Sequence, residues 1–239
     1  MLSSTHLAKL ATKYQTTELN IRREYGQHLL LSYIYQQRAA ADLHFKGGTA
    51  LRLIYHSPRF SEDLDFDTPL HDVSIWEKVL ESSLLDVSRE NIEVDIQESK
   101  ITTGGYLAII NLKNLVSPLS LHLEISFRKN TVAGEIFTIE NDFIPPYPIK
   151  ALSTTQLVDG KLHALFDRGK ARDFYDLYFL LRAGLLTLDQ KKQLERVQDI
   201  LRHTSINFDR ELSLFLPKSQ SLVVHDFKKT LLQEIDRNT

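Results

Sequence analysis

The stretch "FKGGTALRLIYHSPRFSEDLDFD", residues 45–67, joins a glycine pair to three acids at alternate positions. A short apolar run, "LHF", leads into Gly47 and Gly48, and "TALRLIYH" follows with helical spacing until Ser57 and Pro58 stop it. The segment "EDLDFD" then alternates acidic and apolar residues, which predicts a strand with its acids on one face. The stretch therefore predicts a strand, a glycine turn, a helix and a second strand.

The first two acids of the second strand suit a metal ion. On a strand, Asp63 and Asp65 project to the same side about 7 Å apart, and they repel each other unless a cation lies between them. Mg²⁺ prefers oxygen ligands and takes one or two carboxylates, with water and substrate phosphates in its other positions. The pair therefore suits a metal that carries a nucleoside triphosphate, whereas Asp67, at the exit of the strand, is expected to stay solvated.

The glycine pair suits a phosphate. Without side chains at Gly47 and Gly48, backbone N–H groups and the following helix N-terminus can approach a phosphate closely, and Thr49 can add a hydroxyl. Ser61 is expected to orient the turn before the acids. A glycine pair alone more often marks a plain turn, and a lone Asp-x-Asp more often a solvated strand face, so the functional hypothesis depends on their combination.

The rest of the chain divides into an α/β half and a helical half. Alternation predicts strands in "NIEVDIQES", "GYLAIINLK" and "LSLHLEISF", which would form an antiparallel or mixed sheet covered by helices. The three prolines of "NDFIPPYPIK" are expected to exclude a central strand there and to mark a boundary. We expect an α+β fold with an α/β domain over residues 1–145, including N-terminal helices, and a helical C-terminal domain over residues 146–239.

Composition excludes several classes of site. The 239 residues include no cysteine, which excludes disulfides, thiolate metal sites and cysteine nucleophiles, and the nine histidines show no spacing typical of a zinc site. The net charge of −2 gives no global basic field, so a polyanion partner needs a local patch. No apolar segment is long enough to span a bilayer, and we expect a cytoplasmic protein without a membrane partner.

A third carboxylate has two candidates. In "LSLHLEISF", Glu124 lies on the polar face of a predicted strand whose other face is apolar, so this strand is expected to be central. If it lies beside the Asp-x-Asp strand, Glu124 can complete the metal site or take a proton from an attacking hydroxyl. Asp95, on the polar face of "NIEVDIQES", is the alternative.

These pieces, in this order, resemble the signature of the DNA polymerase beta-like nucleotidyltransferase superfamily. More closely, residues 45–67 resemble the first motif of the AbiEii/AbiGii toxin family, the nucleotidyltransferase toxins of type IV toxin–antitoxin systems. Thr49 stands where the superfamily commonly has serine, and the spacing to Asp63 is slightly long. The resemblance covers roughly residues 20–185 and implies a nucleotidyltransferase-type mixed sheet flanked by helices.

The segment "DGKLHALFDRGKARDFYDLYFLL", residues 159–181, resembles later motifs of the same family. There the resemblance gives importance to Lys161 and to one aspartate, leaving Asp173 and Asp176 as alternatives. Physically, the lysine would meet a phosphate, and Arg168, Lys170 and Arg172 would form a local positive cluster. The structural alternative is a solvated lysine and aspartates that pair with Arg172 or cap a helix.

The sequence thus predicts two sets of site residues. The predicted catalytic set is Asp63, Asp65, Glu124, Lys161, Asp173 and Asp176, of which Asp63, Asp65 and Glu124 are the metal ligands. The predicted phosphate-binding set is Lys46, Gly47, Gly48, Thr49, Ser61, Arg168 and Arg172.

The expected reaction is Mg²⁺-dependent transfer of a nucleoside monophosphate from an NTP to an acceptor hydroxyl, with Mn²⁺ as the alternative ion. The family resemblance implies an RNA acceptor such as the tRNA 3′ end and a cognate antitoxin protein. Two alternatives stay open. One is nucleotidylation of a protein hydroxyl, and the other is a catalytically silent protein that binds a nucleotide or a partner.

Overall fold

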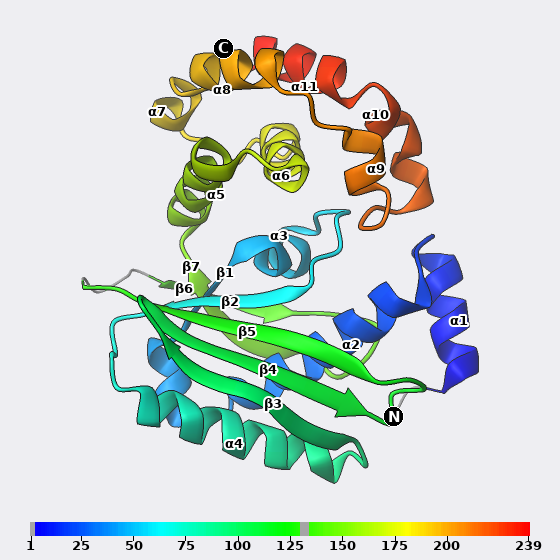
Figure 1. Cartoon of the computed structure of the whole chain (residues 1–239), viewed down its shortest axis with the longest axis vertical. Helices are drawn as coiled ribbons and strands as arrows, with labels where there is room; N and C mark the ends of the chain where they lie inside the picture. The colour runs from blue at the N-terminus through cyan, green and yellow to red at the C-terminus, as the bar shows by residue number, and fades with distance from the viewer. Residues whose placement is uncertain (1–2, 130–133) are drawn as a thin grey trace. The chain divides into compact units, whose positions relative to one another are not determined.

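The computed structural model describes residues 3–129 and 134–239, which form two compact units (Figure 1). The sheet unit comprises Met1–Tyr55 and Phe60–Leu152, and the helical unit comprises His56–Arg59 and Ser153–Thr239. The short segment His56–Arg59 thus belongs to the helical unit, although the chain on both sides of it belongs to the sheet unit.

The sheet unit is built on one seven-stranded mixed sheet with the order β3-β4-β5-β2-β1-β7-β6. Strand β2 pairs in parallel with β5, β1 pairs in parallel with β7, and the other neighbours are antiparallel. The expected α+β class with a mixed sheet flanked by helices is confirmed. The strands are β1 (His44–Lys46), β2 (Asp63–Thr68), β3 (Glu93–Thr102), β4 (Gly105–Lys113), β5 (Leu119–Phe127), β6 (Gly134–Ile139) and β7 (Tyr147–Leu152).

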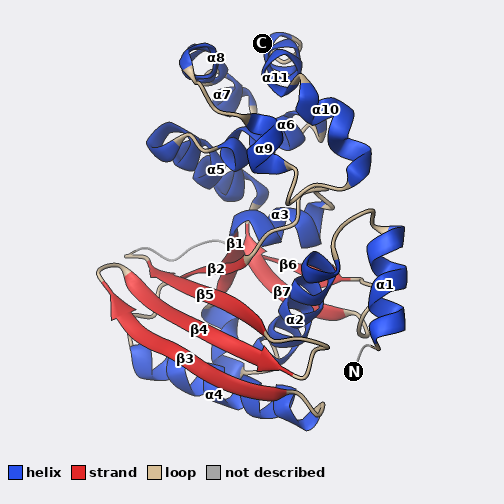
Figure 2. Ribbon diagram, turned by 45° about the vertical axis from the view of Figure 1, so that its right-hand side comes forward, coloured by secondary structure: helices blue, strands red, loops and turns tan. Residues whose placement is uncertain are grey.

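Helices cover the apolar face of this sheet. Helix α2 contacts β5 and β7, and α4 runs along the sheet against β3 and β4 (Figure 2). The alternating apolar residues of β2 and β5, such as Leu64, Phe66, Leu121 and Leu123, are fully or almost fully buried. Their polar neighbours in sequence therefore lie on the opposite face. The helices of this unit are α1 (Ser4–Lys13), α2 (Glu18–Ile34), α3 (Gly47–Tyr55) and α4 (Val73–Arg89), with a 3₁₀ turn at Arg38–Asp42.

The proline-rich segment contains a strand, so that part of the sequence prediction is wrong. Residues Tyr147–Leu152 form β7, which lies between β1 and β6. Pro148 pairs with Thr138 of β6, whereas β1 meets β7 only at Ala151. Because β1 does not reach Pro148, the missing N–H of the proline removes no backbone hydrogen bond between β7 and β1.

The helical unit packs around aromatic side chains of α6. Phe174 and Tyr175 are buried, and their rings contact Phe208 and Phe227, as expected for core residues rather than a surface for stacking bases. Ser153 caps α5 by accepting a hydrogen bond from the backbone of Gln156. The helices are α5 (Thr154–Arg168), α6 (Ala171–Arg182), α7 (Leu188–Lys191), α8 (Leu194–His203), α9 (Phe208–Leu212), α10 (Ser221–His225) and α11 (Phe227–Asp236), with a 3₁₀ turn at Lys218–Gln220.

Among the described residues, no helix is both long enough and apolar enough to cross a membrane.

A buried histidine makes the sheet unit sensitive to acid. His28 of α2 is 2% exposed, and its Nδ1 lies 2.7 Å from the hydroxyl of Tyr147 on β7. Burial, and secondarily the charge of Arg52, lower the pKa of His28 to about 3. The side chain is therefore neutral in the folded protein at every pH near neutrality.

We expect the free energy of unfolding to fall as the pH drops below 6.5. The unfolded chain binds a proton at His28 near the ordinary pKa of 6.5, whereas the folded protein does not until about 3. Between pH 6.5 and 5 the loss from this residue should reach about 2 kcal/mol. Urea unfolding of the wild type and of His28→Gln across this range should give a shallower pH dependence in the variant, and equal slopes would contradict the assignment.

Candidate active site

The register of β2 brings the predicted carboxylates together. Asp65 lies opposite Glu124 of β5 on one side and opposite Lys46 of β1 on the other. Asp63 lies opposite His122 in the same parallel pair. Since paired residues on neighbouring strands share a face, the acids of β2 and Glu124 occupy the polar face that lies away from the apolar core.

The alternative third carboxylate lies elsewhere on the sheet. Asp95 belongs to the edge strand β3, which β4 and β5 separate from β2. Its register partner on β4 is Asn111, which in turn pairs with Ser120 of β5. At about 4.8 Å per strand, three strand spacings put Asp95 about 14 Å from β2. The geometry therefore favours Glu124 over Asp95.

The ligand types at this position fit a hard cation, but they do not form a complete cage. Glu124 is exposed and makes no ion pair with any residue of the described segments. The side chain of Asp63 is 36% exposed, and the Nδ1 of His122 lies 3.8 Å from it. Within residues 3–129 and 134–239, no group of three or more histidine, cysteine, aspartate or glutamate side chains is placed to hold a metal ion. The site Asp63, Asp65 and Glu124 therefore stays a prediction, in which water and substrate would supply further ligands.

The glycine turn lies directly against the acid strand. Gly47 has φ of +85°, in the left-handed region that favours glycine. A Cβ atom at this position would lie 2.1 Å from Oδ2 of Asp65. The backbone conformation therefore favours glycine, and any side chain at this position would have to displace the Asp65 carboxylate. The two halves of the stretch 45–67 meet at this contact.

Thr49 and Gln27 hold the acid strand and the loop before it in place. The hydroxyl of Thr49, which is buried, donates to the backbone carbonyl of Asp63 at 2.5 Å. This bond fixes α3 to the start of β2. Because the Thr49 hydroxyl donates its proton to Asp63, that proton does not face a phosphate as the sequence predicts. The Nε2 of Gln27 on α2 donates to the carbonyls of Ser61 and Glu62 at 3.0 and 3.2 Å. Gln27 therefore orients this loop, a role that its position inside a helix did not reveal.

The third acid of the strand is buried and paired, so the expectation of a solvated Asp67 is wrong. Asp67 is 6% exposed, and its Oδ1 lies 2.5 Å from the Nζ of Lys46 and 2.9 Å from the Nε of Arg128. The Lys46 amine also donates to the hydroxyl of Ser126 at 3.1 Å. The pairing of β1 and β5 on either side of β2 brings these cations to Asp67, and sequence alternation could not show that pairing.

In the helical unit, Lys161 and Asp176 form a buried ion triad with Arg59. The guanidinium of Arg59 binds both carboxylate oxygens of Asp176, at 2.7 and 2.9 Å, and the Nζ of Lys161 lies 2.7 Å from Oδ2. Burial acts to raise the pKa of Asp176, but the charges of Arg59 and Lys161 outweigh it and hold the pKa at about 2. The alternative of a solvated Lys161 is therefore wrong. Arg59, in the turn "SPRF", is a partner that sequence analysis missed.

Asp173 has a structural role at the start of α6. Its carboxylate accepts from the backbone N–H of Lys170 at 3.1 Å and from two guanidinium nitrogens of Arg168, at 2.7 and 3.0 Å. Of the two structural alternatives, helix capping is confirmed, and the ion pair is with Arg168 rather than Arg172. Arg172 and the Lys170 amine make no ion pair with the part of the chain that the structure describes. These two side chains carry the free positive charge of the predicted cluster.

The contact between Gly47 and Asp65 predicts that Gly47→Ala damages both stability and activity. Left-handed backbone costs alanine about 1–2 kcal/mol, and the added methyl group must displace the Asp65 carboxylate. Gly104→Ala is the matched control, because a Cβ there meets nothing within 4 Å. Thermal unfolding and a transfer assay should show a loss in Gly47→Ala alone, and a fully active Gly47→Ala protein would contradict the geometry.

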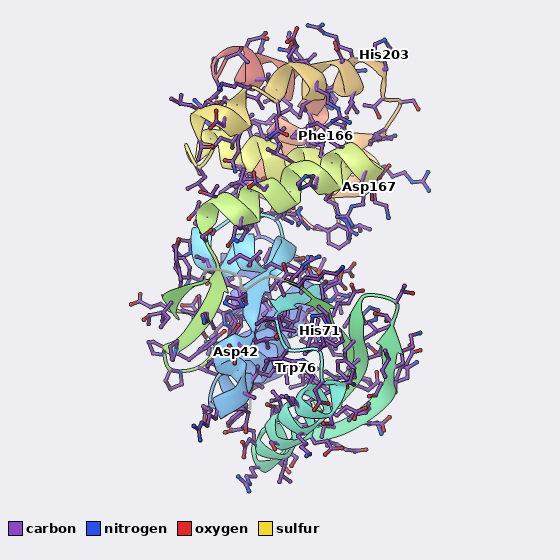
Figure 3. All side chains as sticks on the ribbon, turned by 90° about the vertical axis from the view of Figure 1, so that its left-hand side faces the viewer. Asp42, His71, Trp76, Phe166, Asp167 and His203 are labelled. Atoms are coloured by element: carbon purple, nitrogen blue, oxygen red, sulfur yellow. The ribbon has the colours of Figure 1, made fainter. Side chains whose placement is uncertain are left out.

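The ion triad predicts a large stability loss in Asp176→Asn. The change leaves Arg59 and Lys161 buried without an anion, which typically costs about 3–5 kcal/mol. The pKa of Asp176 is about 2 in the folded protein, whereas its ordinary value is 3.8. The contribution of Asp176 to the free energy of unfolding is therefore fully present above pH 3.8 and is lost as the pH falls through 2. Asp167→Asn, an exposed change on α5 (Figure 3), should leave the free energy of unfolding almost unchanged. Equal effects of the two changes in urea unfolding would refute the buried triad.

The family described as "Nucleotidyl transferase AbiEii toxin, Type IV TA system" matches residues 28–237. No curated protein matches the chain significantly.

Three solved structures share the fold at low identity. JHP933 from Helicobacter pylori is 23% identical with a TM-score of 0.66 over 93% of each chain. A structure described as a putative nucleotidyltransferase from H. pylori is 22% identical with a TM-score of 0.68, over 93% of this chain and 95% of that one. MenT4, a nucleotidyltransferase toxin from Mycobacterium tuberculosis H37Rv, is 18% identical with a TM-score of 0.64, over 100% of this chain and 93% of that one. The chain therefore belongs to the AbiEii family and is a nucleotidyltransferase toxin of the type IV toxin–antitoxin class, which implies a nucleotide substrate and an antitoxin partner.

Proposed function

We propose that the protein transfers a nucleoside monophosphate from an NTP to an acceptor hydroxyl in a Mg²⁺-dependent reaction. The acceptor oxygen forms a bond to the α-phosphorus, the bond from that phosphorus to the β-phosphate oxygen breaks, and pyrophosphate leaves. The observation that carries the proposal is the pairing of Asp65 with Glu124, with the turn at Gly47 against the Asp65 carboxylate.

The residues of the sheet unit have distinct roles in this reaction. The backbone N–H groups of Gly47 and Gly48 and the N-terminus of α3 bind phosphate oxygens. Asp63 and Asp65 would hold the metal, with Mn²⁺ as a substitute ion. Glu124 completes the metal site or accepts the proton of the attacking hydroxyl. The bound metal would neutralise charge that develops on the phosphate oxygens and on the leaving group.

The helical unit supplies positive charge. The Lys161 ammonium has three N–H donors, and its bond to Asp176 leaves donors for a phosphate. In this proposal Asp176 positions the amine. Arg172 and Lys170 would bind the backbone of the acceptor. The net charge of −2 leaves such a local patch as the basis for RNA binding.

For the acceptor, we propose the 3′ end of tRNA in the cytoplasm, with an antitoxin opposing the reaction. The support for this choice is family membership together with a local basic cluster. A protein hydroxyl as acceptor would use the same chemistry at the α-phosphorus, so the acceptor must be identified by labelling.

Incubation with each radioactive NTP, Mg²⁺ and total cellular RNA tests the proposal. Wild type should label a small RNA, and Asp65→Asn and Glu124→Gln should each lower the rate about a thousandfold or more, since both remove charge from the metal site. Asp95→Asn is the matched control and should retain activity, because Asp95 lies on the far edge strand.

One outcome would overturn the proposed metal site, and another would overturn only the proposed acceptor. Undiminished transfer by Asp65→Asn would exclude the metal site on β2. Labelling of protein instead of RNA would replace the acceptor while leaving the chemistry intact.

A further inference from the structure

Two cations share one buried carboxylate oxygen at the end of β2. The Nζ of Lys46 and the Nε of Arg128 both lie within ion-pair distance of Oδ1 of Asp67, at 2.5 and 2.9 Å. Lys46 comes from β1, Asp67 from β2, and Arg128 directly follows β5. We call Lys46 and Arg128 the cation pair.

Lys46 and Arg128 share a single carboxylate oxygen of Asp67, and the side chains of Asp67 and Lys46 are only 8% and 20% exposed. Two like charges held together in partial burial repel each other, so a second anion beside them would be stabilised. The Arg128 side chain is 48% exposed and lies open to such an anion from solvent.

The backbone of Arg128 is fixed by hydrogen bonds, whereas the terminal nitrogens of its guanidinium are available to a ligand. Its backbone N–H donates to the Thr68 carbonyl at 2.8 Å, and its carbonyl lies 3.1 Å from the Nε2 of His71. His71 in turn stacks on Phe127, with ring centroids 5.2 Å apart. The terminal NH₂ groups of Arg128 make no hydrogen bond to the described part of the chain. A guanidinium anchored through Nε can present its terminal nitrogens to two oxygens of one phosphate.

The cation pair lies on the same face of the sheet as the proposed metal ligands. Lys46 is the register partner of Asp65, and Asp67 follows Asp65 by two residues, about 7 Å along the strand. This separation is within the reach of a triphosphate whose α-phosphate lies at the metal site. The position also lies at the carboxyl ends of two neighbouring parallel strands, β2 and β5.

We propose that Arg128, together with Lys46, binds a phosphate of the substrate and that Asp67 positions both cations. The inference rests on the proposed nucleotidyl transfer and adds a phosphate site to it. The phosphate can come from the triphosphate tail of the NTP or from a phosphodiester of the acceptor RNA, and both present the same anionic oxygens. A purely structural role, in which the cations only balance the nearby acids, predicts normal phosphate binding once Arg128 is replaced.

The test measures phosphate binding directly. Isothermal titration of the full-length protein with inorganic tripolyphosphate, with and without Mg²⁺, needs neither an acceptor nor turnover. Arg128→Ala should weaken binding about tenfold, and Arg128→Lys should restore only part of it, because lysine keeps the charge but loses the two-point contact. Lys129→Ala is the matched control, since it removes one exposed positive charge at the next residue.

Steady-state kinetics then identify the source of the phosphate. If the NTP supplies it, Arg128→Ala should raise the KM for the NTP about tenfold with little change in the KM for RNA. If the acceptor RNA supplies the phosphate, Arg128→Ala should instead raise the KM for RNA, and tripolyphosphate then binds as a mimic of the RNA phosphodiester backbone. Thermal unfolding of both variants, with Arg128→Lys as the conservative replacement, separates loss of binding from loss of folding.

The inference is overturned if Arg128→Ala binds tripolyphosphate as the wild type does, or if Lys129→Ala weakens binding equally. Failure of the proposed function has a different signature. A protein that transfers no nucleotide to any RNA but binds tripolyphosphate in an Arg128-dependent way would keep the phosphate site and reject the reaction.

Discussion

Strand β2 lies between β1 and β5, and this pairing determines which charged groups meet in the sheet unit. Leu64 and Phe66 are fully buried on the core face, where Phe66 packs against Phe45 of β1 at 5.3 Å between ring centroids. A register shift of one residue would move these side chains to the open face and turn the acids into the core. Burial of two large apolar side chains, about 1.5–3 kcal/mol each, therefore holds Asp65 beside Glu124 and against Gly47.

The acids of the protein separate into two groups according to their partners. Asp67, Asp173 and Asp176 are buried, and each is bound by arginine or lysine side chains that offset the cost of burying a charge. Asp63 and Glu124 are more exposed, and Glu124 has no ion-pair partner in the described chain. The exposed carboxylates on the sheet face are available to bind a cation, whereas the paired carboxylates fix the positions of lysine and arginine side chains. Asp67 and Asp176 thereby hold cations that we assign to phosphate.

Local pattern predicted strands β1 to β5, because alternation within segments such as residues 63–67 and 119–127 needs no knowledge of distant chain, but it did not predict β6. It also predicted that Gly47 marks a turn before a helix. It favoured Glu124 over Asp95 from the apolar second face of the Glu124 strand, but only the strand order, which is a long-range property, places Glu124 beside Asp65. For the same reason it missed Arg59, which meets Asp176 across more than a hundred residues of sequence, and it excluded a strand at Pro148 without knowing that β1 stops short of it.

A crystal structure with Mn²⁺ and a non-hydrolysable NTP analogue would test the account most directly, because anomalous scattering locates the metal without assumptions about mechanism. The account predicts manganese bound by Asp63 and Asp65, next to Glu124, with the triphosphate against the turn at Gly47 and Gly48. Manganese or nucleotide bound at another part of the chain, with Asp65 and Glu124 left without a ligand, would contradict it.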